Sequence, residues 1–273
     1  MKLAINQATL MKTPMEIFLN ATSKAGFQGV ELRRDETFKY LENNSIEDLK
    51  SNLVNNHLEC ITFNAIELFS LCLEKEFEKI LNYTEKLMFI GNQIDCDTII
   101  TVPSFLEDSS MSDSKIISKT VERLKILAKL AEKYDFKLGF EPLGFPNCSV
   151  RKIDMALKII TNKELPDIGL VIDTFHFFVG EHSINDLNDI PLEKIWLIHI
   201  NDAIEKPFKE LQDSHRVLPK KKGFFNLKIF LQKLKEIGYN RWISLELFNE
   251  EIWKQDPYQI AKESIISIKE IMK

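Results

Sequence analysis

The sequence predicts an α/β protein in which eight parallel strands close into a barrel and helices cover its outer surface. Two observations support this prediction. Short apolar runs rich in β-branched residues alternate along the chain with longer amphipathic stretches, as expected of buried parallel strands followed by surface helices. Eight such runs in 273 residues leave about 34 residues for each strand and its helix, close to the spacing of a (β/α)8, or TIM, barrel.

The expected strands share an apolar core of four or more residues. They are Lys2–Thr9, Gly29–Arg33, Leu58–Asn64, Thr98–Val102, Lys137–Pro142, Gly169–Thr174, Ile195–Asn201 and Trp242–Phe248. Neither a linker nor a low-complexity tract divides them. We therefore expect a single domain that spans residues 1–273.

Local signals indicate where helices begin and end. Thr13-Pro14-Met15-Glu16 has the form of a capping box with proline at the first helical position, which predicts a helix start. Three glycines each follow an amphipathic run and precede a strand, so we predict left-handed helix C-caps at Gly26, Gly91 and Gly238.

Two helices are predicted with a defined buried face. In residues 121–131, Val121, Leu124, Leu127, Ala128 and Ala131 recur at helical spacing. The last helix, near Pro257–Met272, presents its own apolar face, which we expect to pack near the first strand. The one long irregular segment, Ala203–Asn226, has a length that is often associated with function.

Composition and charge restrict the class of protein. Hydrophobic residues make up 44% and charged residues 28%, which is typical of a globular chain. The net charge of -5 argues against a nucleic-acid-binding surface. Neither a signal peptide nor a membrane-spanning run is found, and the four cysteines lack C-x-x-C spacing, so we expect a cytoplasmic protein with reduced thiols. The sequence leaves open whether the chain forms a homo-oligomer.

Four polar signatures stand at the carboxyl ends of the last four predicted strands. They are Glu141-Pro142, Asp173-Thr174-Phe175-His176, His199-Ile200-Asn201-Asp202 and Leu245-Glu246-Leu247. A single acidic residue in such a place is more often a helix cap or an ion-pair partner than a ligand. Four together, each interrupting an apolar run, predict one shared site, because a buried carboxylate needs a positive partner.

The residue types in these signatures suit a divalent cation. Glu141, Asp173, His199 and Glu246 supply three carboxylates and one imidazole, a set that favours Mn²⁺, Zn²⁺, Co²⁺ or Mg²⁺. Such an ion can polarise the carbonyl of a hydroxy-ketone and ease removal of the neighbouring proton, which gives an enediolate. We predict Glu141 and Glu246 as the catalytic base and acid.

Several other residues have two interpretations. His176 either contacts a substrate hydroxyl or packs among phenylalanines, and Arg216 either holds substrate oxygens or is a loop charge. Glu31 and Asn64 either line the same mouth or make structural hydrogen bonds. The run Lys220-Lys221-Lys222 is either a solvated loop or a contact for a phosphate-bearing substrate.

At these residues the chain resembles the xylose-isomerase-like barrels that act on sugars and cyclitols, and among them the isomerases of 2-keto-myo-inositol. The resemblance covers nearly the whole chain. Beyond the four signatures it includes Asn6-x-Ala8-Thr9, Glu31-Leu32-Arg33, Asn64-Ala65, Gly144-x-Pro146-x-Cys148, Asp213-x-x-Arg216-Val217-x-Pro219 and Ser244-x-Glu246-Leu247-Phe248. It departs from the usual Pro-Gly-x-Gly loop at Pro219-Lys220-Lys221-Lys222-Gly223.

The resemblance implies a metal-dependent isomerase of inositol catabolism. It implies that Glu141, Asp173, His199 and Glu246 bind one divalent metal ion, that the two glutamates transfer the proton, and that His176 and Arg216 contact a small polyol ketone or sugar. The alternatives are a ketose 3-epimerase or a sugar-phosphate isomerase or epimerase. A zinc-dependent apurinic endonuclease is disfavoured, since Asn64 and Val102-Pro103 stand where its further histidines are needed.

Overall fold

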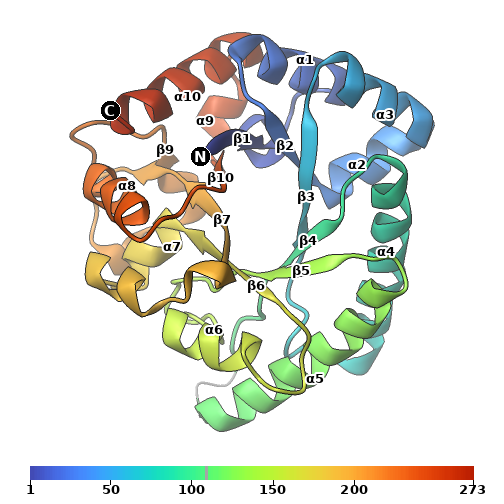
Figure 1. Ribbon diagram of the computed structural model, residues 1–273, viewed down its shortest axis with the longest axis vertical. Helices are drawn as coiled ribbons and strands as arrows, with labels where there is room; N and C mark the ends of the chain where they lie inside the picture. The colour runs from blue at the N-terminus through green and yellow to red at the C-terminus, as the bar shows by residue number, and fades with distance from the viewer. Residues whose placement is uncertain (108–109) are drawn as a thin grey trace.

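The computed structural model describes residues 1–107 and 110–273 and contains a closed barrel of eight parallel strands (Figure 1). In chain order the barrel strands are β1 (Lys2–Asn6), β2 (Gly29–Arg33), β3 (Glu59–Ile66), β4 (Thr98–Thr101), β5 (Lys137–Phe140), β6 (Gly169–Asp173), β7 (Ile195–Ile200) and β10 (Trp242–Leu245). Each pairs with the next in this order, and β10 pairs with β1 to close the barrel. The predicted fold class is confirmed.

The strand boundaries differ from the predictions mainly at the carboxyl ends. The first strand ends at Asn6 instead of Thr9, because the Asn6 side chain accepts a hydrogen bond from the amide of Ala8 and starts a 3-10 helix at Gln7–Leu10. The third strand begins one residue late, at Glu59, and continues past Asn64 to Ile66. Apart from β2, which ends as predicted, and β3, the strands end one to three residues earlier than the apolar pattern suggests.

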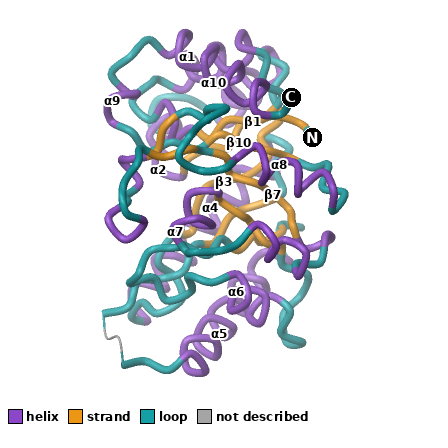
Figure 2. The backbone as a smooth tube through the Cα atoms, turned by 90° about the vertical axis from the view of Figure 1, so that its left-hand side faces the viewer, coloured by secondary structure: helices purple, strands orange, loops and turns teal. Residues whose placement is uncertain are grey.

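Helices surround the barrel (Figures 1 and 2). They are α1 (Met15–Ala25), α2 (Arg34–Leu41), α3 (Ile46–Asn55), α4 (Glu74–Gln93), α5 (Asp113–Glu132), α6 (Ile153–Ile160), α7 (Thr174–Val179), α8 (Leu227–Glu236), α9 (Glu250–Trp253) and α10 (Pro257–Ile271), with further 3-10 helices at Ile184–Asp189, Leu192–Lys194, Phe208–Glu210 and Asp213–His215. None of the helices in the described part of the chain is long and apolar enough to cross a membrane.

The signals for helix ends are partly confirmed. Helix α1 starts at Met15, but the predicted capping box is wrong, since the residue at the N-cap is Pro14 and no side chain caps the helix. Gly26 and Gly238 have φ angles of 96° and 87°, so both left-handed positions are confirmed.

Gly91 has a different role from the one predicted. It lies inside α4, which continues to Gln93, and is not a C-cap. A Cβ atom at this position would lie 2.3 Å from a ring carbon of Phe136 and 2.7 Å from the carbonyl oxygen of Cys96. The glycine therefore permits close packing of α4 against the segment that precedes β5.

The predicted amphipathic helices bury the expected faces. In α5 the five apolar residues named above are all buried. Helix α10 packs beside α1 and buries Ile260, Ala261, Ser264, Ile265 and Ile268. The segment predicted as irregular contains a small antiparallel pair, β8 (Asp202–Ala203) and β9 (Arg216–Val217), which brings Arg216 back toward the barrel.

A small apolar layer fills the barrel below its carboxyl end. This inner apolar layer consists of Ala4, Ile61, Ala65, Ile100, Val102, Val171 and Leu197. Successive side chains of a strand alternate between faces, so Val171 and Leu197 share a face with Asp173 and His199, two residues further on. The polar signatures therefore lie above a packed floor, at the end of the barrel where enzymes of this fold build their sites.

Candidate metal centre

Strand pairing brings the four signatures to one place. Asp173 is the last residue of β6 and stands opposite His199 of β7. Glu141 follows β5 directly, and its amide donates to the carbonyl of Thr101 at 3.0 Å. Glu246 follows β10, and its amide donates to the carbonyl of Ile200 at 3.3 Å. These hydrogen bonds continue the ladder past the strand ends and fix where both glutamates start.

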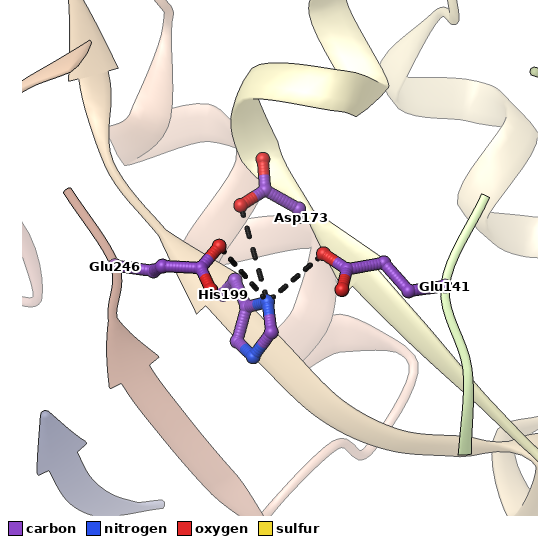
Figure 3. A group of neighbouring side chains, drawn as sticks. All are labelled: Glu141, Asp173, His199 and Glu246. Atoms are coloured by element: carbon purple, nitrogen blue, oxygen red, sulfur yellow. Dashed lines mark hydrogen bonds and ion pairs between the residues drawn. The ribbon is translucent and has the colours of Figure 1, made fainter. Parts of the chain in front are cut away.

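The four side chains converge within the barrel mouth (Figure 3). One potential ligand atom from each of Glu141, Asp173, His199 and Glu246 lies within 4.8 Å of the others, and all four residues are buried. The Nδ1 atom of His199 lies 3.0 Å from Glu141 Oε1, 3.4 Å from Glu246 Oε2 and 4.0 Å from Asp173 Oδ2. The structure thus assembles the set of four that the sequence predicts.

The two carboxylate oxygens of Asp173 have different hydrogen-bond partners. Its Oδ1 accepts from the amide of His176 at 2.9 Å and caps α7. Its Oδ2 accepts from Arg216 Nη1 at 2.6 Å and from Asn201 Nδ2 at 2.9 Å. Burial works to raise the pKa of Asp173, but the charge of Arg216, with smaller contributions from His176 and His199, lowers this pKa to about 2. The carboxylate is therefore ionised and aimed at the cluster.

The site has an excess of buried negative charge. Four carboxylates are buried here, those of Glu31, Glu141, Asp173 and Glu246, and the guanidinium of Arg216 pairs with two of them, Asp173 and Glu246. Burial raises the pKa of Glu246 to about 8, against the attraction of His199 and with repulsion from Glu141. Burial opposes a charge on His199, yet the carboxylates of Glu31, Glu246 and Glu141 hold its pKa well above the usual value. A bound divalent cation would relieve this excess, so the residues fit the predicted metal.

Arg216 links the cluster to His176. The guanidinium side chain is 1% exposed and also donates to Glu246 Oε2 at 3.0 Å and to Asp213 Oδ1 at 2.9 Å. Its Nη2 lies 3.0 Å from His176 Nε2. A guanidinium can only donate, so His176 Nε2 accepts this hydrogen bond and the imidazole is neutral. Burial and the nearby charge of Arg216 lower the pKa of His176 accordingly.

A pocket of about 260 Å³ opens over the cluster. Two members of the cluster, Glu141 and Glu246, line it together with His176 and Arg216. Its remaining polar lining consists of Arg33, Asn64, Glu67 and Asp213, and its apolar lining consists of Leu68, Val102, Phe105, Leu143, Phe145 and Phe248. Asp173 and His199 are not among the lining residues. The two glutamates therefore face the space that a ligand can enter.

Several residues near the cluster carry a weaker sequence signal. Asn6 and Asn64 both donate to Glu246 Oε1, at 2.9 and 3.3 Å, and Asn201 holds Asp173. Asn64 both makes a structural hydrogen bond and lines the pocket, so its two interpretations are not exclusive. Only the position of Asn6 and Asn201 at strand ends could have indicated their contacts.

The lysine run lies away from this pocket. Lys220 and Lys222 line a different cavity, beside Asp202, Val217 and Phe224. All three lysines of the run are exposed. The structure therefore favours a solvated loop over a contact with a ligand held at the four-residue cluster.

The fold and the site define a class of protein that the comparisons also identify. The sequence profile of the xylose isomerase-like TIM barrels matches residues 19–271, so the chain belongs to that family. Two relatives that match over nearly their whole length are inosose isomerases. The inosose isomerase of Bacillus velezensis is 30% identical over 97% of this chain and 95% of its own length. That of Halalkalibacterium halodurans is 29% identical over 98% and 96%.

A solved structure supports the same assignment. The crystal structure of an IOLI protein with a bound zinc atom has a TM-score of 0.93 to this chain and is 28% identical to it. The match covers 100% of this chain and 98% of the other. The resemblance drawn from the sequence motifs is confirmed.

Proposed function

We propose that the protein is a metal-dependent isomerase that moves a carbonyl group between adjacent carbons of a keto-inositol or a related sugar. The observation that supports it most directly is that Glu141 and Glu246 belong both to the four-residue cluster and to the pocket wall. Glu141, Asp173, His199 and Glu246 would hold Zn²⁺, Mn²⁺, Co²⁺ or Mg²⁺. The similarity to inosose isomerases over the whole chain supports the same reaction class.

The two glutamates are suited to move a proton across a bound substrate. A divalent cation at this site would polarise the substrate carbonyl and make the neighbouring C–H more acidic. Glu141 enters the pocket from the end of β5 and Glu246 from the end of β10, so a ligand between them meets a carboxylate on two sides. One removes the proton from carbon and the other supplies one to the adjacent carbon of the enediolate, while the hydroxyl proton passes to the former carbonyl oxygen.

Hydrogen bonds fix the orientation of the Glu246 carboxylate. Its Oε1 accepts from Asn6 and Asn64, and its Oε2 accepts from Arg216. With both oxygens held, the carboxylate has little freedom to rotate away from the pocket. Such positioning is needed because proton transfer requires the base and the carbon to be held close together.

The pocket favours an uncharged substrate over a phosphorylated one. The two arginines that line it are already paired, Arg216 with three carboxylates and Arg33 with Glu67 at 2.7 Å. Lys220 and Lys222 line another cavity. The apolar side of the pocket, which includes Phe145 and Phe248, suits the C–H face of a polyol ring. We therefore prefer a neutral polyol ketone to a sugar phosphate.

The rival functions make different demands on the site. A ketose 3-epimerase would use the same residues and the same enediolate, so only the product distinguishes it. The apurinic endonuclease requires further histidine ligands, whereas Asn64 here donates a hydrogen bond to Glu246. Two other histidines have partners outside the four-residue cluster. His182 Nδ1 lies 3.1 Å from Asp186 Oδ2, and His215 Nε2 lies 3.2 Å from Lys206 Nζ. A cytoplasmic location is also part of the proposal, and the four unpaired cysteines support it.

Solvent exchange measured by NMR tests this proposal. Purified protein is incubated in D₂O with Mn²⁺ or Zn²⁺ and 2-keto-myo-inositol, and we expect metal-dependent deuterium incorporation beside the carbonyl. Glu246→Gln should lower the exchange rate by about 10²- to 10⁴-fold, the usual contribution of a general acid or base, while the circular dichroism spectrum is retained. Lys220→Ala is the matched control and should leave the rate unchanged.

The outcome separates the candidates. Absence of exchange with any cyclitol or ketohexose would refute the enzyme assignment. Exchange with an epimerised product, and no movement of the carbonyl, would favour the ketose 3-epimerase. Binding of three zinc ions per chain would favour the endonuclease.

A further inference from the structure

Glu31 holds the side of the His199 ring that faces away from the cluster. It lies on β2 and is fully buried. Its Oε2 is 3.1 Å from His199 Nε2, whereas the three carboxylates of the cluster surround Nδ1. The imidazole is therefore held at both nitrogens by acidic groups from different strands.

The cost of burying Glu31 calls for a compensating function. The carboxylate forms no ion pair with lysine or arginine among the residues that the structure describes. Besides His199, the hydroxyl of Thr62 donates to the same Oε2 at 2.9 Å, and a side-chain hydrogen bond with Ser244 also lowers the pKa of Glu31. Removing a carboxylate from water costs several kcal/mol unless a positive charge compensates it, and among the described residues His199 is the one ionisable group that pairs with Glu31.

The chemistry of a histidine ligand supplies that function. A ring nitrogen that binds a cation must present its lone pair, so with Nδ1 facing the cluster the hydrogen must be on Nε2. Glu31 can accept only when Nε2 carries that hydrogen. The contact thus selects the tautomer and prevents the ring from turning, and Thr62 holds the accepting oxygen in place.

We propose that Glu31 is a positioning residue that presents His199 Nδ1 to a divalent cation and strengthens its binding. This inference rests on the proposed metal centre. Glu31 is not expected to touch the substrate, since it is fully buried and is not among the residues that line the pocket. Its effect is therefore expected on metal affinity even when no substrate is present.

The test is the zinc affinity of the metal-free protein, measured by competition with a chromophoric chelator. Glu31→Gln keeps the size of the side chain and removes its charge, and we expect affinity to fall about 10- to 100-fold, the usual cost of losing such a partner. Thr62→Val keeps the carboxylate and is the matched control, with an expected loss well below that of Glu31→Gln. The visible absorption of the Co²⁺-loaded protein should change in Glu31→Gln, because the imidazole is less firmly oriented.

Thermal unfolding of each metal-free variant shows that it is folded. Glu31→Asp, which keeps the charge but has a shorter reach, should lose affinity like Glu31→Gln and replaces it if the amide variant does not fold. Wild-type zinc affinity and an unchanged Co²⁺ spectrum in a folded Glu31→Gln or Glu31→Asp protein would overturn the inference. A wild-type protein that binds no divalent cation would instead overturn the proposed metal centre itself.

Discussion

Metal affinity should rise steeply with pH, because the metal-free site holds protons that a cation must displace. The pKa of Glu246 is raised to about 8 and that of His199 is raised well above its usual value. Between the ordinary pKa values of these groups and the raised ones, the folded, metal-free protein binds protons that the unfolded chain would release. A ligand set must be deprotonated to bind a metal, so binding releases them.

The size of the effect follows from the number of protons displaced. With a pKa of about 8, Glu246 is about nine-tenths protonated at pH 7. Between pH 6 and pH 7 one proton from Glu246 and one from His199 must leave, so the logarithm of the affinity should rise by about two per pH unit, or about 3 kcal/mol. The interaction between the two groups makes these protons a property of the cluster rather than of either side chain. The contribution of Glu246 to this increase should flatten above pH 8.

Chelator competition at several pH values measures this slope, after correction for the chelator's own protonation. Calorimetry in buffers of different ionisation enthalpy counts the released protons independently. In Glu246→Gln one of the two protons is absent, so the slope should fall to about one even though the affinity is weaker. A wild-type affinity that does not change between pH 6 and pH 8 would refute the proposed charge excess.

Two further predictions concern stability. Gly91→Ala should destabilise the protein by about 1–2 kcal/mol in urea unfolding, because overpacking against Phe136 outweighs the better helix propensity of alanine; unchanged stability would show that α4 can move. Ser45→Ala should cost about 1 kcal/mol, because Ser45 and Asp48 form a reciprocal capping box at the start of α3, and an equal midpoint in thermal unfolding would contradict this.

The barrel could be predicted from the sequence because its strands are buried on both sides. Runs such as Ile195–Ile200 are almost wholly apolar, and each is followed by a helix with one apolar face. The ends of the strands were harder to predict from the sequence, since they depend on single hydrogen bonds such as that from the Ala8 amide to Asn6. Gly91 shows the same limit: its need for a small side chain comes from Phe136, far away in the sequence.

The candidate site could be predicted from the sequence for a related reason. Parallel strands bring their carboxyl ends together, so Glu141, Asp173 and Glu246 were expected to meet once the barrel was assigned. Contacts across the barrel were not, because strand spacing does not specify which side chains touch. The hydrogen bond between Glu31 and His199, and the several bonds of Arg216, depend on side-chain directions that only the folded structure reveals.

The inner apolar layer limits the route by which a ligand can reach the site. Its members Ile100, Val171 and Leu197 also line a second cavity at the amino-terminal end of the barrel, and this cavity shares no lining residue with the pocket over the cluster. We therefore expect a ligand at the cluster to enter and leave through the pocket at the carboxyl end of the barrel, and not through the apolar layer. While a ring occupies that pocket, the glutamate that holds the abstracted hydrogen is shielded from bulk solvent, so it should exchange that hydrogen for deuterium mainly after the product has left.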